Sequence, residues 1–100
     1  MQKILCAAVW IAEPKIYQCQ PKNIESGIVV SGRRHHNCYA TLDALNPSLL
    51  RNALDNKYPV IEGFLTDGDV FVTSEIGANI AYNAGQIPDK INLLISENLY

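Results

Sequence analysis

The sequence has few charged residues and no cluster of one sign large enough to dominate its surface. Asp, Glu, Lys and Arg make up 18% of the chain, and the formal net charge is −2 at pH 7. Broad binding to the phosphate backbone of DNA or RNA needs clustered lysines and arginines, so we expect no nucleic-acid partner. A weakly charged surface favours self-association, so we expect a homo-oligomer.

Long apolar runs are also missing. No run approaches the ~20 residues of a membrane-spanning helix, so we expect no membrane association. The run at residues 4–12 follows one charged residue, Lys3, as a secretory signal does. Its removal would take away the single tryptophan, Trp10. We therefore interpret this run as a buried strand and expect a cytoplasmic protein.

Cysteines are few, and metal-binding motifs are absent. Cys6, Cys19 and Cys38 are an odd number with no C-x-x-C pair, which fits free thiols in a reducing cytosol. A zinc site of Cys38 with His35 or His36 is conceivable, but adjacent histidines are poor joint ligands and no second cluster exists. We expect no metal and no cofactor. The P-loop, dinucleotide-binding, zinc-protease and nucleophile-elbow motifs are missing as well.

The pattern of apolar residues predicts a single domain over residues 1–100. Strands are expected at 3–12, 16–20, 27–31, 60–65 and 70–72, helices after Gly32, Asn46 and Thr73, and an extended segment at 91–95. The two strands after residue 59 form a hairpin turning at Asp67-Gly68. The order predicts an α+β fold, an antiparallel sheet with two to three helices packed on one face.

Helical spacing predicts which side chains face the core. In the first helix these are Cys38, Leu42 and Leu45. Leu49, Leu50, Ala53 and Leu54 indicate a short second helix. The last helix is expected to bury Ile76, Ile80 and Ala84, with small residues beside them that allow close packing.

Residues 31–38 hold the most informative motif. Arg33, Arg34, His35 and His36 follow one another directly after an apolar strand and a Ser-Gly pair. A helix that begins here presents unpaired backbone N–H groups and the positive end of its dipole. Two guanidinium groups beside those N–H groups favour a phosphate or another anion. The alternative is a solvated pair of arginines that bonds to nearby carboxylates.

Both histidines allow a catalytic interpretation. Acid–base chemistry at His35 or His36 needs an orienting acid and a nucleophile or metal, and the neighbouring sequence supplies neither. We therefore favour ligand binding over catalysis and expect no enzyme. Two alternatives remain: a small phosphodiesterase or hydrolase that uses these histidines, and a protein-interaction module that docks a partner through the basic segment.

Further candidate ligand contacts lie later in the chain. Phe64 follows Gly63 and precedes the hairpin turn, so we expect it at a rim where it stacks on a base. Thr66 and Asp67 are candidate contacts to the edge of the ligand. The last helix carries amides at i, i+4 and i+7, namely Asn79, Asn83 and Gln86, of which Asn83 and Gln86 are the candidate contacts.

Five short motifs occur in a distinctive order. They are G-R-R-H-H-N at 32–37, G-F-L-T at 63–66, F-V at 71–72, A-G-Q-I at 84–87 and S-E-N-L-Y at 96–100. Together they resemble a group of small phage and prophage proteins, and we identify that group with the first family of Thoeris anti-defence proteins. Where relatives are expected to have a charged pair after F-V, this chain has Thr73-Ser74, so its ligand preference is expected to differ.

The resemblance implies a sponge for a signalling nucleotide. Proteins of that family bind a cyclic ADP-ribose isomer made by bacterial TIR-domain enzymes, without cleaving it, in pockets between subunits. Some also take up cyclic oligonucleotides. For this chain the resemblance implies a homo-oligomer, either a dimer or a hexamer, in the host cytosol that sequesters glycocyclic ADP-ribose. Arg33 and Arg34 would hold phosphates, and His35, His36 and Asn37 would orient phosphate or ribose.

Overall fold

The computed structural model describes residues 2–99 and contains one four-stranded sheet. Its elements in chain order are β1 (Ile4–Ile11), β2 (Ile28–Gly32), α1 (His35–Leu45), α2 (Pro47–Leu54), β3 (Val60–Thr66), β4 (Phe71–Thr73), α3 (Ser74–Asn83) and the 3₁₀ helix η1 (Ser96–Asn98). The strand order is β2-β1-β3-β4, and every neighbouring pair is antiparallel. The predicted α+β fold is confirmed.

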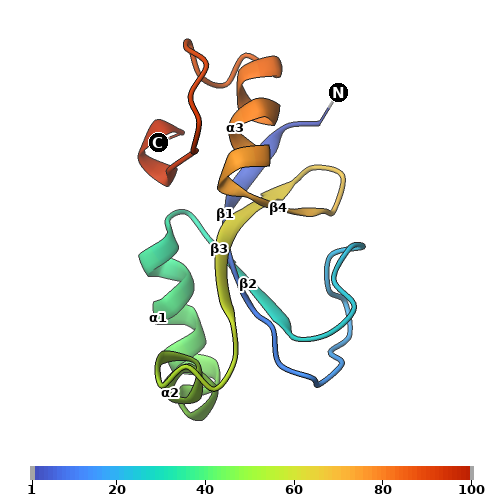
Figure 1. Cartoon of the computed structure of the whole chain (residues 1–100), viewed down its shortest axis with the longest axis vertical. Coiled ribbons are helices and arrows are strands. Elements are labelled where there is room, and N and C mark those ends of the chain that lie inside the picture. The colour runs from blue at the N-terminus through green and yellow to red at the C-terminus, as the bar shows by residue number, and fades with distance from the viewer. Residues whose placement is uncertain (1, 100) are drawn as a thin grey trace.

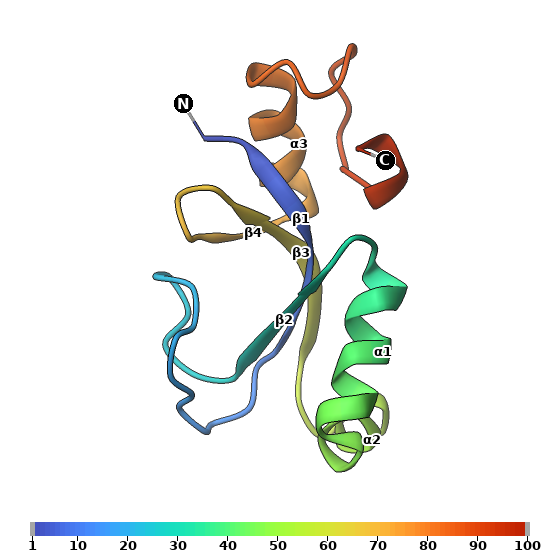
Figure 2. The same cartoon turned by 180° about the vertical axis from the view of Figure 1, so that it is seen from behind.

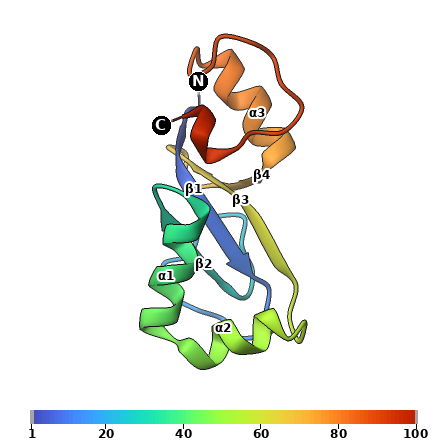
Figure 3. The same ribbon diagram turned by 90° about the vertical axis from the view of Figure 1, so that its left-hand side faces the viewer.

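The helices cover one face of the sheet. Figure 3 shows α1, α2 and the C-terminal segment in front of the strands, with α3 above them. β1 is central, and its alternate residues Ala7, Val9 and Ile11 face the helices with no more than 1% of their surface exposed. Central strands covered in this way are apolar along their length, which is why residues 4–12 read as a buried strand.

The opposite face is covered by the long loop at residues 12–27, which lies away from α1 and α2 in Figures 1 and 2. Trp10 packs edge-on against Phe71 there, with ring centroids 6.1 Å apart. The Asn23 side chain donates to the Phe71 carbonyl at 2.7 Å and accepts from the Phe71 N–H at 2.9 Å, so it pairs with β4 as a neighbouring strand would. The buried Glu13 carboxylate accepts a hydrogen bond from Tyr17.

Two predicted extended segments lie outside the sheet. The strand predicted at 16–20 is wrong, because Ile16 makes only an isolated bridge to Gly27 and is 78% exposed. Five weakly alternating residues offered no apolar face to bury, and side chains tie this loop to the sheet instead. Residues 91–95 form no strand and instead cross α3, where the Leu94 N–H donates to the Ser74 carbonyl at 3.0 Å.

The helices begin where the sequence predicts, but two residues that were predicted to face the core are exposed. Asn46 caps α2 by accepting from the Leu49 N–H at 3.1 Å, and Thr73 caps α3. Leu45 is 71% exposed and Ile76 is 53% exposed, so both predictions of burial are wrong. The small residues of α3 face the sheet instead, which brings the helix backbone close to the core.

Leu54 is 65% exposed on α2. Tyr100, which belongs to the last sequence motif, lies outside the described residues. Within residues 2–99, no helix combines the length and the apolar character needed to cross a membrane.

Candidate functional site

The basic residues lie at the start of α1, as the sequence predicts, and Arg33 to His36 are called the basic turn below. Arg33 precedes the helix, Arg34 is its N-cap, and His35 and His36 are its first two residues. Gly32 ends β2 opposite Ala7, and a Cβ at this glycine would lie 3.0 Å from Asn37 Cβ, so its absence lets the helix begin close to the strand. Arg33 and His36 are exposed, and the first turn contains no acidic residue. Positive charge at this end of a helix opposes the helix dipole and favours an anionic neighbour.

His35 points back toward the sheet. Its Nε2 lies 2.9 Å from the Gly63 carbonyl oxygen, and its ring meets the Phe64 ring edge-on with centroids 5.2 Å apart. A carbonyl only accepts hydrogen bonds, so Nε2 must carry the proton in this contact. His35 therefore holds α1 on β3, and its other nitrogen, Nδ1, is the atom left for other contacts.

Arg34 and Asn37 also have structural partners. Arg34 Nη1 lies 3.3 Å from Glu97 Oε1 of η1. The Asn37 side chain accepts from the Arg34 N–H at 3.1 Å and so closes the first turn of α1. The turn thus joins two segments far apart in the sequence, the start of α1 and the C-terminal segment.

The prediction that Phe64 stands at a rim is wrong. Its side chain is fully buried, at 0% exposure. A Cβ added at Gly77 of α3 would lie 3.3 Å from Phe64 Cδ2 and 3.5 Å from Leu94 Cδ2. Phe64 therefore lies where α1, α3 and the C-terminal segment meet, and it cannot stack on a ligand in this conformation.

The remaining predicted contacts gather around the start of β1, where most of them support the backbone. Thr66 is 2% exposed and lies opposite Ile4. The Gln86 side chain accepts from the Ile4 N–H and donates to the Ile4 carbonyl, both at 2.8 Å. Asp67 accepts from the Lys3 N–H at 2.9 Å. Thr66, Gln86 and Asp67 thus contact the residues at the start of β1 and not the basic turn, and they stabilise that end of the sheet.

Asn83 is the exception among these residues. It is exposed at the end of α3, and no hydrogen bond to its side chain is found within residues 2–99. The Asn83 amide is accessible, and its role in ligand binding stays a prediction.

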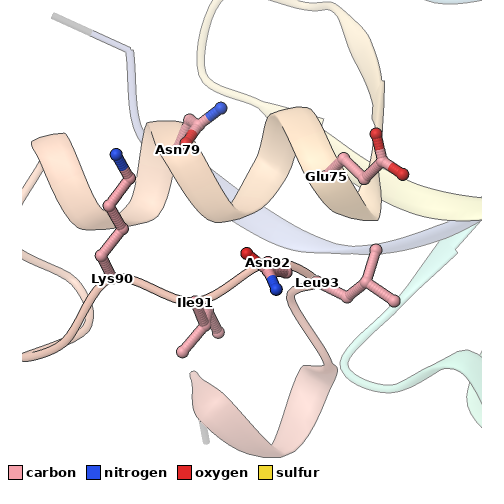
Figure 4. Close-up of a pocket in the computed structure, with 6 residues that line it drawn as sticks. All are labelled: Glu75, Asn79, Lys90, Ile91, Asn92 and Leu93. Atoms are coloured by element: carbon pink, nitrogen blue, oxygen red, sulfur yellow. The ribbon is translucent and has the colours of Figure 1, made fainter.

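A groove of about 490 Å³ lies between α3 and the segment that crosses it, and the sequence did not predict it. Its lining residues come from the exposed side of α3 and from four consecutive residues of the segment: Glu75, Asn79, Lys90, Ile91, Asn92 and Leu93. Figure 4 shows Glu75 and Asn79 on α3, with residues 90–93 running alongside the helix and the Lys90 side chain extending toward it. Asn79 is the one lining residue that the amide pattern of α3 had singled out.

The groove cannot be predicted from the local sequence, for a physical reason. Residues 90–93 have no helix or strand pattern of their own, and their position depends on the contact between Leu94 and Ser74. A site between two segments that are distant in sequence leaves no local signal except the exposed polar residues on α3.

Two side chains next to the basic turn have strongly raised pKa values. Burial, together with the Glu62 carboxylate 2.7 Å away, raises the pKa of Tyr39 well above its ordinary value. Burial likewise raises the pKa of the Cys38 thiol to about 11. A thiol held protonated is a poor nucleophile, so Cys38 acts as a small apolar core residue. Within residues 2–99, no three His, Cys, Asp or Glu side chains are grouped to hold a metal ion.

The protein is a small α+β domain with two polar surface features. One is the basic turn at the start of α1, and the other is the groove between α3 and residues 90–93. The chain belongs to the family described as phage T4 y16D protein, whose sequence profile matches residues 3–100. It is therefore a phage protein, as the motif resemblance indicated. No curated protein and no solved structure matches the chain.

Proposed function

We propose that this phage protein binds a small anionic signalling nucleotide of the glycocyclic ADP-ribose type in the host cytosol and holds it without cleaving it. Such sequestration would block a Thoeris-type bacterial defence, and cyclic oligonucleotides are a second class of anionic ligand. The observation that carries the proposal is the basic turn at the start of α1, where Arg33 and His36 are exposed beside Arg34.

Binding explains this turn better than hydrolysis does. A metal-independent phosphodiesterase needs two imidazoles free to act as acid and base at one phosphate. Here His35 donates to the Gly63 carbonyl and packs on Phe64, so the two histidines face different environments. His36 alone is exposed, which suits phosphate or ribose binding.

A homo-oligomer is part of the proposal. Leu45 and Leu54 are 71% and 65% exposed at the end of the molecule formed by α1 and α2. A shallow hollow of about 260 Å³ lies beside Leu54 and Asp43 on the same helices. Exposed leucines next to a hollow support an interface between copies, and tight binding of a small ligand is favoured when subunits enclose it.

The test is calorimetric titration with purified glycocyclic ADP-ribose. Arg33→Ala and Arg34→Ala are each expected to weaken binding by about tenfold or more, which is ~1.4 kcal/mol for a lost charge-assisted contact. Lys22→Ala, which removes an exposed cation on the loop at residues 12–27, is the matched control and should bind as the wild type does. Glu97→Gln separates a direct role of Arg34 from its role in holding η1.

Unchanged binding in both Arg33→Ala and Arg34→Ala would overturn this site. Equal losses in Arg34→Ala and Glu97→Gln would assign Arg34 to holding the C-terminal segment, and Arg33 would then be the remaining phosphate contact to test. Complete absence of nucleotide binding in the wild type would favour the protein-interaction alternative.

A further inference from the structure

Residues 90–93 line the groove with a backbone that has no hydrogen-bond partner. Within residues 2–99, no hydrogen bond involves a backbone N–H or C=O group of this segment, and the next N–H group along the chain, that of Leu94, donates to the Ser74 carbonyl. Asn92 and Leu93 are exposed, so water takes these bonds in the free protein. A run of unpaired backbone groups at the surface is a template on which another chain can pair.

The polar side chains of the groove are unpaired too. Within the described part of the chain, no hydrogen bond or ion pair involves the side chains of Glu75, Asn79, Lys90 and Asn92. A side-chain amide both donates and accepts, as a peptide group does. Asn23 bonds in this way to both backbone groups of Phe71, and Gln86 does the same on β1. Asn79 and Asn92 offer the same pairing to a chain that lies in the groove.

Opposite formal charges stand at the two ends of the groove, with the two asparagines between them, as Figure 4 shows. The contact between Leu94 and Ser74 sets this order, because Glu75 follows Ser74 directly and Lys90 precedes Leu94 by one short stretch of chain. That stretch, from 90 to 94, spans at most about 14 Å. The two charges are therefore spaced for a short extended peptide.

We infer that this groove binds an extended peptide segment of a partner protein, with a basic residue next to Glu75 and an acidic residue next to Lys90. The peptide backbone pairs with residues 90–93 and with the two asparagine amides. Antiparallel pairing is the more stable arrangement of two extended chains, and it places the N-terminal end of the peptide beside Leu93 and Glu75. The recognised order is a basic residue first and an acidic residue about three positions later.

A peptide fits this set of groups better than a single ion does. An anion bound by Lys90 would leave Glu75 without a partner, and a cation bound by Glu75 would leave Lys90 without one. Neither ion would use the backbone of residues 90–93. An extended peptide uses the two charges, the two amides and the backbone together. This inference does not rest on nucleotide binding at the basic turn, whose residues do not line the groove.

The experiment is an NMR titration of the full chain with two tetrapeptides blocked at both ends, Lys-Val-Val-Glu and Glu-Val-Val-Lys. The lysine-first peptide is expected to shift the backbone amides of residues 75, 79 and 90–93 saturably. The glutamate-first peptide should bind about fivefold more weakly, because in the same chain direction both of its charges meet like charges. Methylation of both central backbone nitrogens of the lysine-first peptide should also weaken binding about fivefold, since it removes backbone donors.

A charge exchange within the groove reverses the expected preference. In the double variant Glu75→Lys with Lys90→Glu, the glutamate-first peptide should bind about fivefold more tightly than the lysine-first peptide. Both side chains are exposed, so the exchange should leave amide shifts outside the groove unchanged. The matched control, Glu25→Lys with Lys57→Glu, exchanges the charges of exposed residues outside the groove and should keep the wild-type preference.

The peptide site and the basic turn can fail separately. Arg33→Ala should keep the wild-type response to the lysine-first peptide whether or not it binds nucleotide. Absence of shifts at the groove with either peptide, or an unchanged preference in the exchanged variant, would overturn the inference. Shifts at residues 90–93 that grow as the protein alone is concentrated would also overturn it, because a second copy of the chain would then fill the groove.

Discussion

At the scale of one residue, the fully buried Phe64 ring marks the place where α1, α3 and the C-terminal segment meet. The neighbouring glycine and the nearby turn suggested a rim position, yet three elements far apart in the sequence close over its ring. Gly63 has its own reason for being small, because a Cβ there would lie 2.2 Å from the Val72 carbonyl oxygen. Local sequence records the glycine but not the packing that surrounds the phenylalanine.

The burial of Phe64 makes a direct prediction. Phe64→Ala should lower the free energy of unfolding by about 3–5 kcal/mol, and the milder Phe64→Leu by about 1–1.5 kcal/mol, measured by urea denaturation. Tyr82→Ala, which truncates an aromatic side chain that is 42% exposed, is the control and should change it little. A variant at 64 with wild-type stability and impaired ligand binding would restore the rim interpretation.

At the scale of elements, side-chain amides take the place of neighbouring strands. Gln86 pairs with both backbone groups of Ile4, and Asn23 does the same for Phe71. Such pairs satisfy the free edge of a strand without another strand. The Gln86 amide, a candidate ligand contact in the sequence, is therefore already hydrogen-bonded within the protein.

Gln86→Ala should therefore destabilise the protein by about 1–3 kcal/mol, since it leaves two backbone groups of Ile4 without partners. The urea midpoint of this variant, compared with that of Asn83→Ala at the exposed end of α3, measures the effect. Equal midpoints for the two variants would mean that the Gln86 contacts contribute nothing to stability.

The strands and helices themselves were largely accessible to sequence reasoning. β1, β2, the β3–β4 hairpin and the starts of the three α-helices follow from apolar runs, a D-G turn and cap residues. What could not be predicted depends on contacts between distant segments: the loop over Trp10 and Phe71, the exposure of Ile76, and the groove formed by residues 90–93. The basic turn was found because its four residues are adjacent in the sequence.

At the scale of the whole molecule, the raised pKa of Cys38 couples stability to pH. The folded thiol has a pKa of about 11 and its ordinary value is 9.0, so the unfolded chain releases this proton first. The contribution of the thiol is complete below about pH 9 and is lost as the pH rises through about 11. The raised pKa of Tyr39 acts in the same direction at still higher pH.

Urea unfolding at about pH 8 and about pH 10 should show a loss of about 1 kcal/mol attributable to Cys38. Cys38→Ala should reduce this difference, whereas Cys19→Ala, which alters an exposed thiol, should leave it unchanged. Stability that rises between these two pH values would contradict the assignment of a buried, protonated thiol.

The proposed capture of an intact signalling nucleotide is tested by native mass spectrometry of the purified protein after incubation with glycocyclic ADP-ribose, followed by heat denaturation and identification of what is released. We expect an oligomer that gains mass in steps of one ligand and releases the same molecule unchanged. An oligomer with no added mass, or a ligand released in altered form, would contradict it.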